Sequence, residues 1–382
     1  MKKLSFTCLL FLFSLLSFGQ TFEWVRSYGS TNYDRIWDAE VHGNQIGTIG
    51  SFDGALTFNP TNPVPNVSHN GGGDILLNIY TTSGQLLVSK AFGGAGIDWS
   101  RSLDFDKWGN MYVTGTFSSS VNFDRSTTGS FTKTSNGGTD VFLAKFDSIG
   151  NAIWVKTFGG TSNDEGINVV VNASSEVIVT GTYSGTVDFD PNSAIQNATS
   201  NSNSTDIFLS KFDSAGNLIW NKTFGSSSNN DASREIAIDR SNNIIFVGFY
   251  GGTIDFDPSP AIVNLPHSSQ VDAFITKLDN QGNLVWAKNI SSSSEIMIKG
   301  VKISKLNEVV VGGHFYNTVD FDPSSATAFR TSNGSKEMFV LKLDSNSNFD
   351  FVKTLGSSSA DVVEKIELDS YDNIFCTGYY FG

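Results

Sequence analysis

Short apolar runs, each closed by polar turn residues, recur along this chain in groups of four. In one group the runs are Gly166–Val171, Val177–Tyr183, Asp206–Phe212 and Asn217–Phe224. Runs of this length, rich in Val, Ile, Phe, Tyr and Thr and bounded by Gly, Asn, Asp or Ser, predict strands and turns. No stretch beyond the first 19 residues keeps the spacing of an amphipathic helix. The pattern therefore predicts an all-β chain built from a four-stranded unit.

This unit returns at a spacing of about 66 residues. Its second half reads DVFLAKFDSIGNAIWVKTFG at Asp140–Gly159 and DIFLSKFDSAGNLIWNKTFG at Asp206–Gly225, and looser copies begin at Asp74, Asp272 and Glu337. A fixed period of this size indicates a repeat architecture. A repeated four-stranded unit is the blade of a β-propeller, so we expect a propeller of four-stranded blades.

The copies of the four strands are not equal in number. The second strand recurs six times and the third only five times, so we expect five complete blades and a partial sixth between residues 34 and 382. The run Phe22–Tyr28 is an extra fourth strand, and we expect it to be the outer strand of the last blade, which removes free edges. Because the sixth blade lacks its third strand, we expect a truncated chain whose natural form continues past Gly382.

The N-terminus has the three parts of a secretory signal peptide. Lys2 and Lys3 precede an apolar run from Leu9 to Leu16, and small residues end at Gly19. The run is too short to span a bilayer. We expect residues 1–19 to be removed, leaving a propeller at 20–382 with no integral membrane segment, secreted or held at the cell surface.

Charge and cysteine content exclude one class of partner and one means of stabilising the fold. The formal charge is −13, which argues against nucleic acid because binding there depends on Lys and Arg neutralising phosphate. Without the signal peptide the chain keeps one cysteine, Cys376, so no intrachain disulfide can form. We expect a monomer stabilised by its core alone.

The repeats resemble the SBBP-type β-propeller repeats of secreted bacterial proteins. The resemblance rests on VTGTYSGTVDFDP at Val179–Pro191 and TDIFLSKFDSAGNLIWNKTFGS at Thr205–Ser226, together with their copies. It covers essentially everything after the signal peptide. It implies an exported or surface-displayed scaffold and does not identify a ligand.

A second similarity concerns tryptophan. Phe212–Trp220 (FDSAGNLIW) is similar to the signature of quinoprotein propellers, in which tryptophans dock one blade onto the next. The same slot holds Trp24, Trp154, Trp220 and Trp286. We expect these side chains to pack between blades, since the sequence offers no sign of a quinone pocket.

Two sets of carboxylates are candidate binding residues. The first lies in repeated Asp-Phe-Asp-Pro segments: Asp188 and Asp190, Asp255 and Asp257, and Asp320 and Asp322. Alternate residues of a strand share a face, so each pair could hold Ca²⁺ through oxygen ligands. The alternative is a turn that uses the aspartate side chain to end the strand.

The second set is one acid per blade where the chain enters an inner strand. A ring of carboxylates at the channel mouth could bind a cation or a basic ligand, and the alternative is a repeated turn-capping acid. The set comprises Asp34, Asp98, Asp164, Asp231, Glu295 and Asp361.

The sequence favours binding over catalysis. It has no Gly-x-Ser-x-Gly, His-Glu-x-x-His or phosphate-loop motif, and its four histidines share no repeat position. We expect an exported binding, adhesion or scaffold module for an unidentified glycan or protein. The polar links Ser118–Thr139 and Asn192–Thr205 are further candidate binding loops. The alternative is an enzyme on a propeller scaffold, either a quinoprotein-like oxidoreductase or a polysaccharide-active enzyme.

Overall fold

The structure is a computed structural model that describes residues 23–58, 69–124, 131–227, 231–267, 271–292 and 294–381. In these ranges the regular elements are strands, apart from a single 3-10 turn at Asn201–Asn203. The expectation of an all-β chain is confirmed. No helix within the described ranges is long and apolar enough to cross a membrane. The proposed signal peptide, residues 1–19, lies outside the described residues.

Five antiparallel four-stranded sheets form the complete blades, each with its strands in chain order. Blade 1 contains β2 (Asp34–His42), β3 (Gln45–Phe52), β5 (Asp74–Thr81) and β6 (Leu86–Phe92). Blade 2 contains β7 (Asp98–Phe105), β8 (Met111–Asn122), β9 (Thr132–Phe146) and β10 (Ala152–Phe158). Blade 3 contains β11 (Glu165–Val171), β12 (Val177–Ser184), β15 (Thr205–Phe212) and β16 (Leu218–Phe224). Blade 4 contains β17 (Ala232–Ile238), β18 (Ile244–Tyr250), β19 (Asp272–Leu278) and β20 (Leu284–Ile290). Blade 5 contains β21 (Ile296–Ile303), β22 (Val309–Phe315), β25 (Glu337–Leu343) and β26 (Phe349–Leu355).

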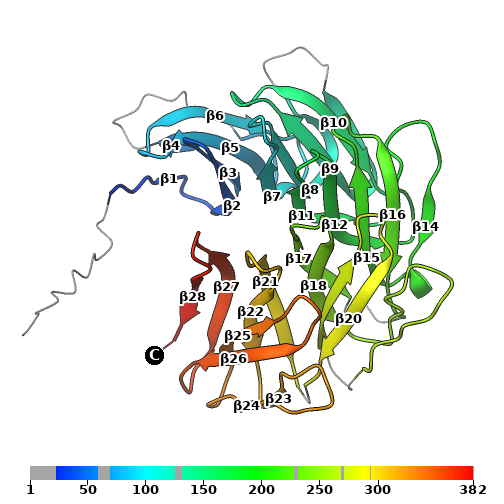
Figure 1. Ribbon diagram of the computed structural model, residues 1–382. Helices are drawn as coiled ribbons and strands as arrows, with labels where there is room; N and C mark the ends of the chain where they lie inside the picture. The colour runs from blue at the N-terminus through cyan, green and yellow to red at the C-terminus, as the bar shows by residue number, and fades with distance from the viewer. Residues whose placement is uncertain are drawn as a thin grey trace, which may run out of the picture.

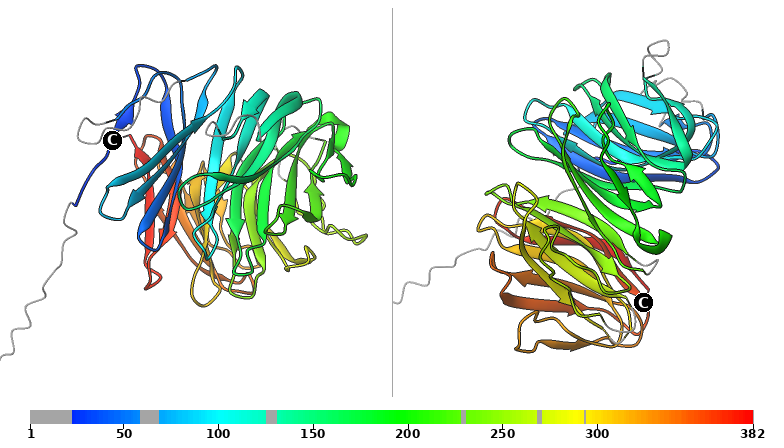
Figure 2. Two further views of the ribbon diagram at one scale, coloured as in Figure 1. Left: turned by 90° about the horizontal axis from the view of Figure 1, so that it is seen from above. Right: turned by 90° about the vertical axis from the view of Figure 1, so that its right-hand side faces the viewer.

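A two-stranded half-blade, β27 (Asp361–Leu368) and β28 (Ile374–Tyr380), follows blade 5. The blades succeed one another around a ring that is open between this half-blade and blade 1 (Figure 1). The first strand of each blade faces the centre (Figure 1). The two turned views show the sheets stacked one against the next (Figure 2). Five complete blades and a partial sixth are therefore confirmed.

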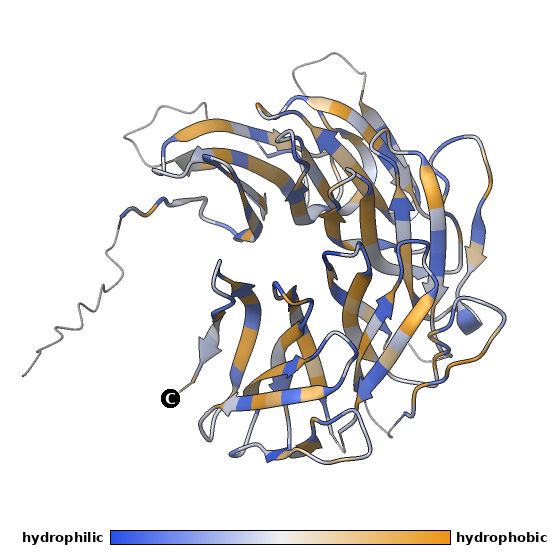
Figure 3. Ribbon diagram, viewed as in Figure 1, coloured by the Kyte–Doolittle hydropathy of each residue, from blue (hydrophilic) through white to orange (hydrophobic). Residues whose placement is uncertain are grey.

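The core lies between neighbouring blades, where the apolar residues of the strands gather (Figure 3). The phenylalanine of each Asp-Phe-Asp-Pro segment contributes to it. The ring centroid of Phe189 lies 5.7 Å from that of Phe158 in blade 2 and 5.3 Å from that of Phe208 in blade 3. Phe256 and Phe321 occupy the matching positions and are also fully buried. The excursion between the second and third strands therefore docks each blade onto the preceding one.

The predicted packing of tryptophan between blades is confirmed. Trp154 Nε1 in β10 donates a hydrogen bond of 3.2 Å to Ser214 O in the β15–β16 turn of the next blade. Trp220 Nε1 donates in the same way to Asn280 O at 3.3 Å. Trp286 packs against the core cluster of blades 4 and 5. The indoles of Trp154 and Trp220 thus hold the outer strand of one blade against the hairpin turn of the next.

The N-terminal segment occupies a different position from the one expected. Trp24 Nε1 donates to Thr82 O at 3.0 Å, so this tryptophan docks on blade 1 as its counterparts dock on their neighbours. Residues 23–27 form no strand, and β1 (Tyr28–Gly29) pairs with β4 (Thr57–Phe58). The prediction of an outer strand paired within the last blade is wrong for the described residues. The reason is that no described strand lies between β28 and this segment, so it has no ladder to join.

Candidate functional site: the channel pocket

Every inner strand has a β-bulge at the same place. In β11, for example, Gly166 pairs with Gly181 and Asn168 with Thr180, which leaves Ile167 without a partner in β12. A bulge of this kind re-aims the side chain of the extra residue. The bulged residues are Trp37, Arg101, Ile167, Arg234, Lys299 and Glu364, one from each inner strand.

A glycine in each second strand accompanies the bulge. A Cβ atom added to Gly181 would lie 1.9 Å from the backbone oxygen of Glu165, two residues before the bulged Ile167. At Gly248 the corresponding oxygen belongs to Ala232, at 2.1 Å. Only glycine permits so close an approach of two backbones. The same contact recurs at Gly50, Gly115, Gly313 and Gly378.

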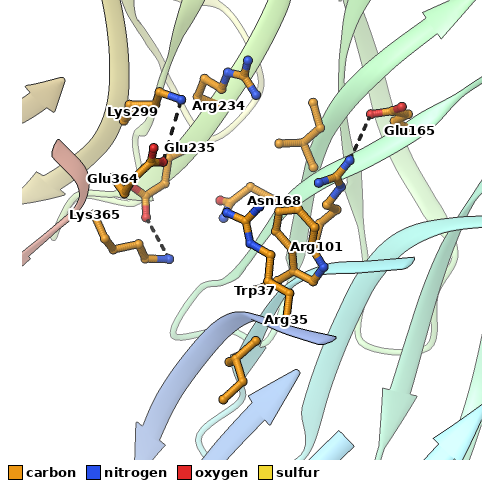
Figure 4. Close-up of a pocket in the computed structure, with 12 residues that line it drawn as sticks. Arg35, Trp37, Arg101, Glu165, Asn168, Arg234, Glu235, Lys299, Glu364 and Lys365 are labelled. Carbon is orange, nitrogen blue, oxygen red and sulfur yellow. Dashed lines mark ion pairs between the residues drawn. The ribbon is translucent and has the colours of Figure 1, made fainter. Parts of the chain in front are cut away.

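The six bulged side chains line one cavity of about 340 Å³ in the centre of the ring. We call this cavity the channel pocket; its lining is completed by Arg35, Ile36, Glu165, Asn168, Glu235 and Lys365. Figure 4 shows Arg234 and Lys299 on one side of the pocket and Arg35, Trp37 and Arg101 on the other. Residues of all six inner strands therefore converge on one space.

The lining has an excess of positive charge. Its five cations, three arginines and two lysines, face three glutamates, which leaves a formal charge of +2. The chain as a whole has a formal charge of −13. A positive cavity in an acidic protein concentrates field lines and attracts anions.

Trp37 contacts two arginines on one wall of the pocket. The guanidinium carbon of Arg35 lies 3.8 Å from the indole centroid, and that of Arg101 lies 4.4 Å from it. Both contacts are cation–π interactions. Arg101 also forms an ion pair of 3.7 Å with Glu165. These contacts hold two guanidinium groups beside the cavity.

Arg234 on the opposite wall has no ion pair with any described residue. Its contact is a cation–π interaction with Phe249, whose ring centroid lies 4.9 Å from the guanidinium carbon. Its buried Nε, like that of Arg101, has no hydrogen-bond acceptor among the described residues. Burial lowers the pKa of Arg234 below its ordinary value, and the charge of Arg101 lowers it further. Neighbouring Lys299 forms a 3.8 Å ion pair with Glu364.

A second cavity, of about 200 Å³, adjoins the channel pocket and has acidic walls. Burial raises the pKa of Glu40 to about 7 and that of Asp104 to about 6. Lys302 also lines this cavity and lies 3.7 Å from Glu235. The channel therefore presents cationic side chains at one level and carboxylates at the next.

The predicted acidic ring lies outside both cavities. Asp164 is fully buried, and its carboxylate accepts hydrogen bonds from the backbone N–H groups of Gly160 at 2.7 Å and Ser184 at 3.0 Å. Asp98 and Asp231 accept equivalent pairs of bonds. These carboxylates cap the turn that enters the inner strand, as the alternative interpretation describes. Binding of a ligand by this ring stays a prediction.

The other members of the ring differ in exposure and partners. Asp34 and Asp361 each accept a bond of 2.5 Å from a backbone N–H, at Ser30 and Ser357 respectively. Glu295 instead forms an ion pair with Lys336 at 3.4 Å and a 3.3 Å hydrogen bond with Nε2 of His314, whose pKa burial lowers to about 4.

The Asp-Phe-Asp-Pro carboxylates close turns. Asp188 Oδ1 accepts bonds from the N–H groups of Asp190 at 3.1 Å and Gln196 at 2.8 Å. The same pattern holds at Asp255 with Asp257 and at Asp320 with Asp322. Among the described residues, no three acids, histidines or cysteines are grouped so that they could hold a metal. Calcium binding by the pairs stays a prediction, and no ligand set beyond two carboxylates supports it.

Sequence reasoning missed the residues of the channel pocket. They differ from blade to blade, so a search for repeated chemistry passes over them. The signal that could have found them is the glycine of the second strand, such as Gly181 in VTGTY, because it marks the place of the bulge in the adjacent inner strand.

No family model matches this chain. It is similar to an uncharacterized WD repeat-containing protein of Acanthamoeba polyphaga mimivirus, with 25% identity over 79% of this chain and 25% of that protein. It is also similar to the regulatory protein FlaEY of Caulobacter vibrioides, with 25% identity over 46% of this chain and 18% of that protein. The chain thus spans a quarter or less of the length of these curated relatives. The repeated sequence and the ring of four-stranded sheets together make this chain a β-propeller repeat protein.

Proposed function

We propose that this chain is an exported binding module of the SBBP type and that its ligand enters the channel pocket. One observation carries the proposal: a bulged side chain from each of the six inner strands reaches the same 340 Å³ cavity. A cavity of this size is in the range of small-ligand sites. Rigid strands supply its walls, which is the arrangement that fixes side chains for recognition.

The lining of the pocket favours binding over catalysis. It contains no His, Cys, Ser, Thr or Tyr, which are the usual nucleophiles and proton carriers. Two of its carboxylates form ion pairs with neighbouring cations, Glu165 with Arg101 and Glu364 with Lys299. Glu235 lies 3.7 Å from both Lys302 and Lys365. Burial raises the pKa of Glu235, and the charges of Lys302 and Lys365 lower it in part. We therefore assign the three glutamates to charge balance within the pocket.

Export of the module is supported by the sequence of residues 1–19, with Lys2 and Lys3 before an apolar run. The similarity to a WD repeat-containing protein supports a scaffold role for the propeller. The test of export is fractionation of cells that express the chain with and without residues 1–19. If the module is exported, the chain with residues 1–19 should leave the cytoplasm and the chain without them should stay there.

The channel is tested with a variant that fills the pocket. Ile167→Trp places a larger side chain in the cavity, and Ile219→Trp makes the same change on the exposed side of β16. Both variants are compared with the parent protein on glycan and acidic-peptide arrays. We expect binding to fall at least tenfold in Ile167→Trp and to be unchanged in Ile219→Trp. Equal binding by the two variants would remove the channel as the site.

A further inference from the structure

We propose that the channel pocket recognises an oxyanion, a carboxylate or sulfate group on the ligand, between Arg101 on one wall and Arg234 and Lys299 on the other. This inference rests on the proposed function, because it takes the channel as the binding site and adds the chemistry that the site selects.

The first observation is the charge left over in the pocket. Arg234 has no carboxylate partner among the described residues, although three glutamates line the same cavity. A cation that is partly removed from water and unpaired is costly to the fold. In a chain with a formal charge of −13, neutralising carboxylates are abundant. The excess positive charge at this one place therefore fits an anion that is supplied from outside.

The second observation concerns the hydrogen-bond donors. The Nε atoms of Arg101 and Arg234 are buried and have no acceptor among the described residues. Because these two atoms have almost no accessible surface, a ligand in the cavity would meet the terminal guanidinium nitrogens instead. The two terminal nitrogens of a guanidinium form a fork that matches the two oxygens of a carboxylate or sulfate. Arg234 lines the cavity, contacts Phe249 and has no ion pair with a described residue. An oxyanion in the cavity would supply the partner that the described residues do not.

The third observation is that the cationic groups are held in place before a ligand arrives. Arg101 lies against the face of Trp37, with its guanidinium carbon 4.4 Å from the ring centroid, and Arg234 lies 4.9 Å from the ring of Phe249. The indole of Trp37 is also covered by Arg35 at 3.8 Å. Because these side chains are already ordered, little conformational entropy remains to be lost on binding.

The size and apolar part of the cavity limit the rest of the ligand. Ile36 and Ile167 are its two aliphatic residues, and its volume of about 340 Å³ has room for one small acid or one terminal residue of a chain. The adjoining cavity has four carboxyl groups, Asp38, Glu40, Asp104 and Glu235, against two lysines, so an anion gains less there than beside the arginines.

The experiment is calorimetric titration of residues 20–382 with sodium glucuronate, sodium glutarate, sodium sulfate and glucose. We expect the anions to bind and glucose not to bind. Comparing the affinities for glucuronate and glutarate tells whether binding needs a sugar ring. Titration with sulfate tells whether an oxyanion alone is enough for binding. A rise in NaCl from 50 to 500 mM should weaken anion binding at least fivefold, because the attraction is screened.

Arg234→Gln should weaken anion binding at least tenfold, and Arg234→Lys should weaken it less, because charge remains without the fork. Arg240→Gln is the matched control, since Arg240 is exposed at the β17–β18 turn, and it should bind within twofold of the parent. Circular dichroism confirms that each variant is folded. Equal anion binding by Arg234→Gln and Arg240→Gln would overturn the inference, and so would the absence of heat with every anion.

These outcomes are separable from those for the proposed function. A neutral ligand that binds the parent and is lost in Ile167→Trp would keep the channel as the site and reject the oxyanion. The opposite result is that anions bind only when Arg234 is present, while the array ligands bind equally well to Ile167→Trp and the parent. That result would keep the oxyanion site and reject the proposed function.

Discussion

The ammonium of Lys365 lies 2.7 Å from the carboxylate of Asp38, although 327 positions separate the two residues in the sequence. This contact crosses the open side of the ring and joins the inner strand of the half-blade to that of blade 1. Asp38 also accepts a bond of 3.1 Å from the N–H of Leu103 in blade 2, and Lys365 lies 3.7 Å from Glu235 in blade 4. Four inner strands thus share one network of charges and hydrogen bonds.

Replacing Lys365 by Met should reduce the free energy of unfolding by about 1–3 kcal/mol. Asp38 is nearly fully buried, and an uncompensated buried carboxylate is strongly destabilising; the effect is smaller here because the lysine is one-third exposed. Urea denaturation measures the change. Lys353→Met, at an exposed position of β26, is the control. The double variant with Asp38→Asn should lose less than the sum of the single changes, and strict additivity would show that the two residues do not interact.

Replacing Trp220 by Ala should destabilise the protein by about 3 kcal/mol. The indole is half-buried between blades 3 and 4 and donates to Asn280 O, so the change removes packing, leaves a cavity and deletes a hydrogen bond. The neighbouring Ile219 is exposed on the same strand, and Ile219→Ala should change stability by less than about 0.5 kcal/mol. A near-neutral result for Trp220→Ala would mean that the indole does not hold the blades together.

Replacing Gly181 by Ala should destabilise the protein by about 1–3 kcal/mol, the usual cost of overpacking. A Cβ atom at this position would lie 1.9 Å from Glu165 O, so the inner strand would have to move and the bulge at Ile167 would shift. Binding in the channel pocket should weaken along with stability. Gly72→Ala is the matched control, because a Cβ there meets its nearest atom at 3.5 Å. Equal melting temperatures for the two variants would disprove the link between the glycine and the bulge.

The fold could be predicted because its signals repeat. Each copy of a strand carries the same apolar alternation, and a position such as Trp220 recurs at Trp154 and Trp286. The channel pocket could not be predicted in this way. Its residues stand at one repeat position but differ in type, as Arg101, Ile167 and Glu364 show. The residues that the blades share are those that pack them together, whereas recognition depends on residues that differ from blade to blade.

The acidic residues illustrate the same limit. Asp164 recurs once per blade and attracts notice as a candidate ligand, yet its carboxylate is occupied by two backbone N–H groups. Repetition here follows from a repeated turn. The bulge that aims Arg234 into the channel is marked only indirectly, by Gly248 in the second strand, because it depends on how the two strands pair.

The metal prediction is tested with Ca²⁺ itself. EDTA-treated protein is titrated with Ca²⁺ by calorimetry, beside the triple variant Asp190→Asn, Asp257→Asn and Asp322→Asn. If the aspartate pairs are calcium sites, the parent should release or absorb heat and gain thermal stability by linkage, and the triple variant should do neither. Absence of both effects in the parent would leave the carboxylates as turn acceptors only.

The contribution of Asp140 and Asp164 to stability should fall as the pH rises from about 4 to about 7. Burial raises the pKa of Asp140 to about 6, although the N–H of Asn136 lowers it in part. Burial raises the pKa of Asp164 to about 7, and the charge of Asp140 adds to that rise. Because the folded-state pKa exceeds the ordinary value of 3.8, the folded state holds protons that the unfolded state releases. The free energy of unfolding is therefore largest below pH 4 for these groups and declines until both are ionised.

Asp140→Asn isolates this contribution. Asp140 Oδ1 is buried and has no hydrogen-bond partner among the described residues, so a neutral amide removes the charge without breaking a bond at that atom. The variant should melt at a higher temperature than the parent at pH 7.5 and show no such gain at pH 4, where the parent carboxyl is already protonated. Asp350→Asn removes a half-exposed carboxylate that pairs with Lys342 at 3.2 Å; it is the surface comparison and should not melt at a higher temperature than the parent at pH 7.5. A gain of equal size at both pH values would assign the effect to packing, because only ionisation makes the difference between the two carboxyl states depend on pH.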